Sequence, residues 1–205
     1  MGRTIESLFI AGPAGRLEAI LEEPEVGSPV EAALVCHPHP QHGGTMHNKV
    51  VYRIAKGLRQ SGAAVLRFNY RGVNLSEGTY ANGEGELDDA RAALAVLRER
   101  YPALPFTLAG FSFGSRIALR LSCEQPARRV IAVGFPTVYR DKAYLTNVSV
   151  PKVFVQSTHD EFGPVTDLQE VFAGLSEPKT LSLIESKDHF FVDALPQLEA
   201  AIQSA

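Results

Sequence analysis

The sequence predicts an α/β fold, with a mostly parallel, doubly wound sheet that begins with an antiparallel N-terminal hairpin. Two observations carry this prediction. Short apolar runs alternate along the chain with longer amphipathic segments, and most of these runs are nearly continuous, as in strands buried on both faces. Strands that are separated by helices pair in parallel, because each helix returns the chain across the sheet. The 205 residues contain no repeat, linker or low-complexity segment, so we expect a single domain over residues 1–205.

The first half of the chain supplies the hairpin and two further strands with a helix between them. The turn-forming run Pro13-Ala14-Gly15 separates the two opening apolar segments. A later segment places Val51, Ile54 and Leu58 at helical spacing and is closed by Gly62. The strands expected in this half are residues 4–12, 15–24, 32–36 and 63–70, with a helix over residues 48–60.

The second half continues the alternation. Its clearest helix spans residues 86–101, where apolar side chains from Leu87 to Tyr101 recur every three or four positions and charged residues lie opposite. Pro102 ends this pattern. The other strands are expected at residues 106–109, 130–135, 152–156 and 180–184, and the other helices at residues 115–125, 167–175 and from about 192 to 203.

Composition limits the partners and the compartment. The formal net charge is −3 and no basic run stands out, which argues against nucleic acid or an anionic membrane as the main partner. No apolar stretch approaches the ~20 residues of a membrane-spanning helix, and the N-terminus resembles neither a signal peptide nor a myristoylation site. Cys36 and Cys123 have no metal-site spacing and are expected to be buried free thiols. We expect a cytoplasmic protein that acts on a small molecule; the sequence leaves its oligomeric state open.

A serine lies on a tight turn between a predicted strand and a predicted helix. The strand at residues 106–109 runs directly into Gly110-Phe111-Ser112-Phe113-Gly114. Such a turn strains the backbone and exposes the serine hydroxyl above the sheet, and the two glycines keep side chains out of the turn. The alternatives are a purely structural turn or a phosphate loop, although Gly-x-Gly-x-x-Gly and Gly-Lys-Ser/Thr are both absent. We expect Ser112 to be a nucleophile.

A serine hydroxyl needs a general base, usually a histidine that is oriented by a carboxylate. On a serine turn of this kind the chain order is serine, acid, histidine. Only His159 and His189 follow the serine, and His159 immediately precedes the candidate acid Asp160, which leaves His189 as the base. Asp160 and His189 each follow a predicted strand, so both lie at the edge of the sheet where ligands bind. Glu161 or Asp188 as the acid, a helix-capping role for Asp160 and a packing role for His189 remain alternatives.

The densest polar segment is the histidine-rich loop, residues 37–47, which follows the strand at 32–36. The loop at this position supplies a second backbone donor to the oxyanion, beside the N–H of the residue after the nucleophile, here Phe113. Pro38 and Pro40 have no N–H, so His39 is the candidate donor. The side chains expected to line the substrate pocket are those of His37, His39, His42 and Arg71, and Arg71 has a structural role as its alternative.

The same loop also permits a metal-binding hypothesis. His37-x-His39-x-x-His42 resembles the His-x-His-x-Asp-His zinc motif of metallo-β-lactamase-like hydrolases, but Gln41 stands where an aspartate ligand is needed. Prolines on both sides of His39 also restrict the loop, and a metal site leaves the Ser112 turn unexplained. A metal-dependent hydrolase that uses loop 37–47 is therefore an alternative, and the main prediction includes neither a metal nor a cofactor.

Taken together, these motifs resemble the α/β-hydrolase superfamily, and within it the small lidless bacterial group related to dienelactone hydrolases and serine aminopeptidase-type domains. The resemblance covers nearly the whole chain. Its carriers are the loop from His37 to Lys49, Phe68-Asn69-Tyr70-Arg71-Gly72, the Ser112 turn, Asp160 with Pro164, and Asp188-His189-Phe190-Phe191. The resemblance implies an α/β-hydrolase fold whose second strand is antiparallel, and a Ser112–His189–Asp160 triad that acts through an acyl-enzyme.

The chain departs from the family pattern after the fourth strand, where Asn74 stands at a position that is commonly glycine. Asparagine tolerates the left-handed backbone conformation better than most residues, so the loop can keep its shape. The stretch at residues 136–151 is too short for the cap domain that the superfamily usually inserts there. The site is therefore expected to be open, which favours small or exposed acyl substrates over long lipids.

These observations predict a serine hydrolase, carboxylesterase-like, that cleaves a small carboxylic ester with water. A thioester, a lactone or a short peptide remains open, because a fold and a triad do not fix the substrate. The alternative from a different class is a non-catalytic binding module on a hydrolase scaffold, which has no need of all three triad residues.

Overall fold

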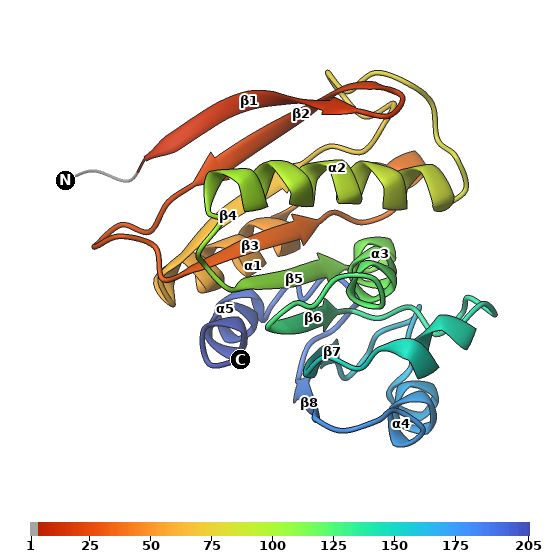
Figure 1. Ribbon diagram of the computed structural model, residues 1–205. Coiled ribbons are helices and arrows are strands. Elements are labelled where there is room, and N and C mark those ends of the chain that lie inside the picture. Colours follow the sequence, from red (N-terminus) through yellow and green to blue (C-terminus); the bar gives the residue numbers. More distant parts are fainter. Residues whose placement is uncertain (1–3) are drawn as a thin grey trace.

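An eight-stranded sheet forms the centre of the protein, here a computed structural model that describes residues 4–205 (Figure 1). The strands lie in the order β1-β2-β4-β3-β5-β6-β7-β8. β2 is antiparallel to both of its neighbours, and the remaining neighbours pair in parallel, as expected from the sequence. The strands are β1 (Ile5–Gly12), β2 (Gly15–Glu22), β3 (Glu31–Cys36), β4 (Ala63–Phe68), β5 (Phe106–Phe111), β6 (Arg129–Val133), β7 (Lys152–Ser157) and β8 (Lys179–Ile184).

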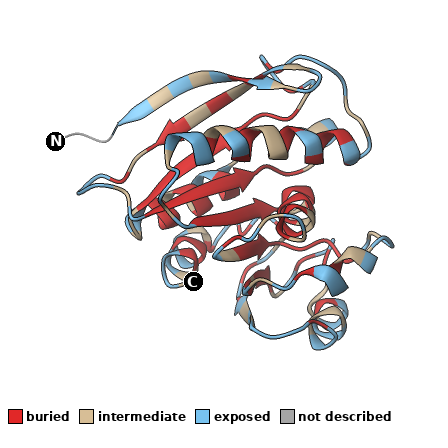
Figure 2. Ribbon diagram, in the orientation of Figure 1, coloured by how far each residue is buried: buried red, intermediate tan, exposed pale blue. Residues whose placement is uncertain are grey.

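Helices cover both faces of the sheet, which confirms the doubly wound architecture (Figure 1). Apolar side chains alternate along the central strands, so that Val35 of β3 belongs to the core cluster on the side of α1 and α5, while Leu34 belongs to the cluster on the side of α2, α3 and α4. Figure 2 shows the result, with β3 and β5 buried throughout and the helices buried on their inner sides. The helices are α1 (Lys49–Gln60), α2 (Glu84–Arg100), α3 (Phe113–Ser122), α4 (Val165–Ala173) and α5 (Leu195–Gln203), with 3₁₀ turns η1 (Pro40–His42) and η2 (Ala143–Asn147).

Several helix boundaries differ from the expected ones by one to three residues, including both ends of α4, Val165–Ala173 instead of 167–175. Side chains explain the starts of two helices. α2 begins at Glu84, because the Glu86 carboxylate accepts the N–H of Gly83 at 2.7 Å and so fixes the first turn. α5 begins at Leu195 rather than near 192, because the Asp188 carboxylate accepts backbone N–H groups in the preceding loop. α3 begins at Phe113, two residues earlier than expected, directly after the serine.

The segment between β6 and β7 contains only the short turn η2, so the sheet carries no cap domain there, as expected. Asn74 adopts φ 49°, the left-handed conformation expected where the family pattern has glycine. Across residues 4–205, no helix has both the length and the apolar character needed to cross a membrane.

Candidate active site

Ser112 occupies the single residue between β5 and α3. Its backbone has φ 54° and ψ −121°, a conformation that costs a non-glycine residue free energy and that the surrounding structure must hold in place. The Ser112 N–H donates to the carbonyl of Val133 on β6 at 2.9 Å. The Ser112 carbonyl accepts the hydroxyl of Ser115 at 2.6 Å. Both bonds fix the strained turn at the carboxyl end of the sheet.

The two glycines of the turn allow the close approach of its backbone to neighbouring segments. A Cβ on Gly110 would lie 2.1 Å from the carbonyl oxygen of Gly114, and a Cβ on Gly114 would lie 2.2 Å from that of Cys36 at the end of β3. Neither contact is possible without moving backbone atoms. The Gly-x-Ser-x-Gly spacing is therefore needed for this geometry.

Asp160 and His189 form a buried pair beside this turn. Asp160 follows β7, and its Oδ2 accepts His189 Nδ1–H at 2.7 Å; the two residues are 3% and 2% exposed. Gln156 Nε2 donates to the same oxygen at 2.9 Å, and the N–H groups of Phe162 and Gly163 donate to Oδ1 at 2.9 Å. Four donors fit a carboxylate, which only accepts. Since Nδ1 of His189 carries its proton toward Asp160, Nε2 is left to exchange a proton on the other side of the ring.

Aromatic rings hold the imidazole of His189. The ring centroids of Phe111 and Phe162 lie 4.8 and 4.9 Å from that of His189, and the ring of Phe190 lies at 5.3 Å. These contacts restrict rotation of the ring and limit the access of water, so the histidine is positioned by packing as well as by Asp160.

Ser112 and His189 open onto one pocket of about 250 Å³, the serine pocket. Within the described part of the chain, the Ser112 hydroxyl makes no hydrogen bond, so its Oγ is not yet bonded to the imidazole; such bonds are often long before substrate binds. The remaining walls come from four loops, with the side chains of Pro38, His39, His42 and Asn48, of Pro136, Val138 and Tyr139, of Phe162, and of Phe190.

The structure places His39 and His42 in the wall of the serine pocket, where their rings stack with centroids 4.4 Å apart. His39 Nδ1 accepts the N–H of Gln41 at 3.2 Å, and its Nε2 lies 3.3 Å from the hydroxyl of Tyr80. Burial and the neighbouring charge of His42 lower the pKa of His39. The backbone N–H groups of His39 and Phe113 have no acceptor in residues 4–205, so both remain free to donate to a ligand.

His37 does not line the pocket, so this part of the sequence prediction is wrong. The side chain is fully buried, with Nδ1–H donating to the carbonyl of Pro38 at 2.7 Å and Nε2 accepting the N–H of Tyr70 at 3.1 Å. It joins the histidine-rich loop to the segment that follows β4. His37 is therefore a structural histidine, and both of its ring nitrogens are used.

Arg71 is also absent from the pocket wall, which corrects its tentative assignment. Its guanidinium binds the buried carboxylate of Asp89 on α2 through Nε and Nη2, at 3.0 and 2.7 Å, and its backbone N–H donates to the same carboxylate at 2.9 Å. Arg71 thus fixes the loop after β4 to α2, the structural alternative expected from the sequence.

The burial of His37 makes stability depend on pH. Desolvation lowers the pKa of His37 to about 3 in the folded protein. As the pH falls below the ordinary histidine pKa, His37 becomes protonated in the unfolded chain but stays neutral in the folded protein. The His37 contribution is therefore complete at neutral pH and is lost progressively on acidification. Between about pH 7 and about pH 5 we expect it to cost about 2 kcal/mol of unfolding free energy. Urea unfolding of wild type and His37→Gln at both pH values measures this: equal losses in the two proteins would contradict it.

The placement of the histidines bears on the metal alternative. Among residues 4–205, histidine, cysteine, aspartate and glutamate side chains form no group of three or more arranged to hold a metal ion. Both nitrogens of His37 are bonded to the backbone, and Nδ1 of His39 accepts from Gln41. The spacing in the sequence therefore does not correspond to a shared ligand geometry.

Gln156 is a residue that sequence reasoning missed. Its side chain is fully buried, donating to Asp160 at 2.9 Å and to the carbonyl of Gly163 at 2.7 Å, while its Oε1 accepts the N–H of Phe135 at 2.8 Å. The available signal was an amide side chain at the end of an otherwise apolar strand, four residues before the acid. Such a residue fixes the loop that carries Asp160.

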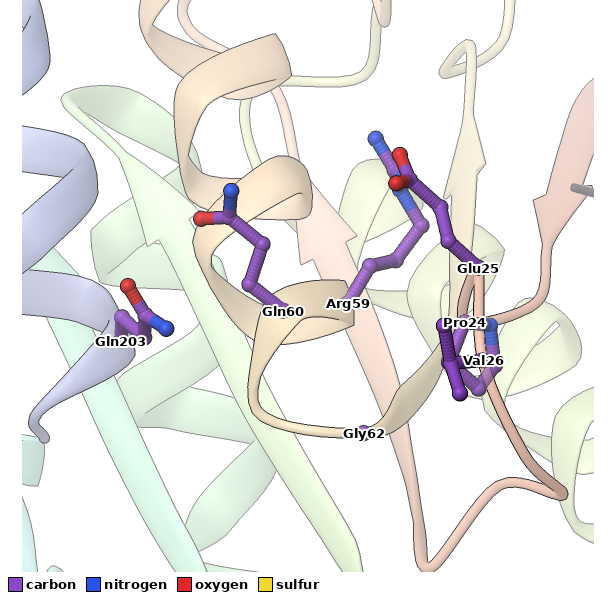
Figure 3. A pocket seen from close by; sticks show the side chains of 7 residues that line it. All are labelled: Pro24, Glu25, Val26, Arg59, Gln60, Gly62 and Gln203. Carbon is purple, nitrogen blue, oxygen red and sulfur yellow. The ribbon is translucent and has the colours of Figure 1, made fainter.

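A second pocket, of about 290 Å³, lies at the opposite edge of the sheet, near the start of β4 and the ends of α1 and α5 (Figure 3). Gln60 and Gln203 face each other on one side, while the Arg59 side chain extends toward Glu25 on the other (Figure 3). Arg59 is buried against Glu22 and Glu25, at 3.8 and 3.6 Å. This pocket contains no serine, cysteine or histidine, so its size alone does not make it a reaction site.

Comparison with known proteins agrees with the fold described above. A family model described as alpha/beta hydrolase domain matches residues 32–197. An uncharacterised protein of Rickettsia prowazekii (strain Madrid E) is 35% identical over 195 residues, covering 90% of this chain and 81% of that protein. An alpha-beta serine hydrolase homologue from Coxiella burnetii is 36% identical with a TM-score of 0.93, covering 97% of this chain and 96% of the other. A lidless serine hydrolase structure from Xanthomonas campestris is 34% identical with a TM-score of 0.92, covering 98% and 92%.

Proposed function

The chain belongs to the α/β-hydrolase domain family, and from this premise we propose that it is a serine hydrolase with Ser112, His189 and Asp160 as its triad. One observation carries the proposal. His189 is bonded through Nδ1 to Asp160 at 2.7 Å and opens onto the same pocket as Ser112, whose backbone is strained. A buried carboxylate, an oriented imidazole and an exposed hydroxyl are the parts that nucleophilic acyl transfer needs.

In the proposed reaction, Ser112 Oγ attacks the carbonyl carbon of the substrate while Nε2 of His189 takes the hydroxyl proton. The carbonyl oxygen becomes an oxyanion, which the backbone N–H groups of Phe113 and His39 stabilise. Nε2 then returns the proton to the leaving oxygen as the acyl bond breaks, and an acyl-enzyme remains. Water repeats the sequence on the acyl-enzyme and releases the acid. Asp160 keeps the proton of His189 on Nδ1 throughout and stabilises the imidazolium.

The proposed substrates are small carboxylic esters, with a carboxylesterase-like activity. The serine pocket is small, about 250 Å³, and apart from its histidines its wall is largely apolar, with Val138, Phe162 and Phe190 among its residues. An acyl group that is short and uncharged near the scissile bond fits such a wall. A thioester or lactone presents the same carbonyl to the same groups, so the proposal concerns acyl compounds of this size.

A fluorophosphonate probe tests this proposal, because it phosphonylates only a serine that an active site has made nucleophilic. We expect stoichiometric labelling of the folded protein, located at Ser112 by peptide mass spectrometry, and none after unfolding in urea. The same protein should hydrolyse short aryl esters, and labelling should abolish that hydrolysis. Well-folded protein that resists the probe but hydrolyses esters in a chelator-sensitive way would favour the metal-dependent alternative, and protein that does neither would favour a binding module.

A further inference from the structure

Two further hollows adjoin the serine pocket along the loops before α1 and α5. The middle hollow, of about 510 Å³, shares Asn48 and Phe190 with the serine pocket, so the two meet at these side chains. A third hollow, of about 370 Å³, shares His47, Lys49 and Leu195 with the second. We call the three together the extended groove, with the serine pocket as its near end and the third hollow as its far end.

The polarity of the extended groove changes along its length. The wall of the serine pocket includes no lysine, arginine, aspartate or glutamate from the described residues. At the far end the wall includes His47, Lys49, Arg53 and Arg67, and no carboxylate from the same part of the chain. A substrate lying along the groove would therefore have its reacting carbonyl in an uncharged site and its remote end among cations.

Not all of these cations are available to a ligand. Arg67 binds the carboxylate of Glu22 through two nitrogens, at 3.0 and 2.7 Å, so its charge is balanced. Arg53 shares the carboxylate of Glu199 with Lys56, at 2.6 and 2.8 Å, so one negative charge serves two positive ones. The far end keeps an excess positive charge even before Lys49 is counted.

Lys49 is the cation most open to a ligand. Its side chain is exposed, it lines both the middle and the third hollow, and it makes no ion pair or hydrogen bond with the described residues. Asp188 is the acidic residue that the described chain contributes to the wall of the middle hollow, and one oxygen of its carboxylate accepts the N–H groups of Phe190 and Val192 at 3.0 and 3.2 Å. Among the described residues, neither Asp188 nor any other carboxylate forms an ion pair with Lys49, so Lys49 is available to pair with an anionic ligand.

The position of His189 indicates which part of a substrate follows this groove. The imidazole must protonate the leaving atom, so the leaving group lies against His189. The residues on either side of it, Asp188 and Phe190, line the middle hollow. A leaving group that extends away from the imidazole therefore passes over Phe190 toward Lys49.

We propose that the preferred substrates are acyl compounds whose leaving alcohol or thiol carries a negative charge, a phosphate or a carboxylate, which binds Lys49 with support from Arg53. This inference rests on the proposed serine hydrolase function and specifies its substrate class. The acyl part stays small and uncharged in the serine pocket, and the anion of the leaving group lies at the far end of the extended groove.

The test compares two series of acetyl esters with leaving alcohols of increasing length, one ending in phosphate and one in an uncharged methoxy group. We expect kcat/KM to favour the phosphate series once the chain is long enough to reach Lys49, with the preference falling as salt is added. Lys49→Gln should reduce the ratio of phosphate to methoxy kcat/KM by about fivefold, mainly through KM. Lys187→Gln is the matched control, since Lys187 also lies near the groove but lines none of its hollows; it should leave the ratio unchanged.

An NMR titration that measures the binding of the phosphate-bearing alcohols to Ser112→Ala protein separates this inference from the proposed function. Lys49-dependent binding without hydrolysis of any ester would support the anion site and reject the hydrolase. Hydrolysis of methoxy esters with no gain from phosphate at any length would overturn the inference and leave the hydrolase standing. A gain confined to anions on the acyl side, measured with aryl monoesters of dicarboxylic acids, would also overturn it, because the leaving group would then be wrongly placed.

Discussion

Ser112→Ala is expected to lower kcat for short aryl esters by at least about ten-thousandfold, because the variant lacks the proposed nucleophile that forms the acyl-enzyme. The loss should not come from unfolding. Ser112 makes its turn contacts through its backbone, and its hydroxyl has no hydrogen bond to the described residues, so alanine keeps every observed contact. Purified variant and wild type are compared by steady-state kinetics and by urea unfolding.

Ser112→Gly separates the chemistry of this position from its backbone strain. With φ 54°, the native turn holds a side chain in a region that glycine enters freely. Glycine should therefore be as inactive as alanine but more stable than it by about 1 kcal/mol, because relief of the backbone strain outweighs the greater freedom of glycine in the unfolded chain. If both variants kept a kcat close to that of wild type, Ser112 would not be the nucleophile, whatever the stabilities of the variants.

The fold could be predicted largely because its central strands are buried on both faces. Such strands leave continuous apolar runs, as in β3, so their positions are visible without knowledge of their neighbours. The start of α5 could not be placed in the same way. It depends on the Asp188 side chain accepting N–H groups of its own loop, and nothing in the apolar pattern separates that loop from a first helical turn.

The candidate site shows the same division. Ser112, Asp160 and His189 each follow a predicted strand. Because the carboxyl ends of parallel strands meet at one edge of the sheet, these positions predict that the three residues lie close together. His37 and His39 lie in irregular backbone, where no period fixes the side-chain direction; one is buried and the other lines the pocket.

Arg71 and Gln156 depend on partners that the sequence pattern does not identify. Arg71 is held by Asp89 from a helix, 18 positions away in the chain, and Gln156 bonds to two separate loops. Contacts of this kind follow from the assembled tertiary structure. The roles of Arg71 and Gln156 therefore depend on the assembled sheet and its loops and not on the local sequence pattern.

Asp160→Asn is expected to lower kcat by about ten-thousandfold while preserving the fold. An asparagine has one accepting oxygen, and the two backbone N–H groups of Phe162 and Gly163 require it at the Oδ1 position. Its NH₂ group must then occupy the Oδ2 position, where the structure has two donors, Nδ1–H of His189 and Nε2 of Gln156.

His189 can accept from that NH₂ group only by moving its own proton to Nε2. The imidazole would then present a donor to Ser112 and could not take the hydroxyl proton, so the nucleophile would lose its base although every residue kept its place. Glu161→Gln and Asp188→Asn are the matched controls, because these are the other carboxylates next to the pair and neither accepts a bond from Nδ1 of His189. The kinetics of the three variants decide the assignment: if either control lost more activity than Asp160→Asn, the carboxylate that orients His189 would have to be reassigned.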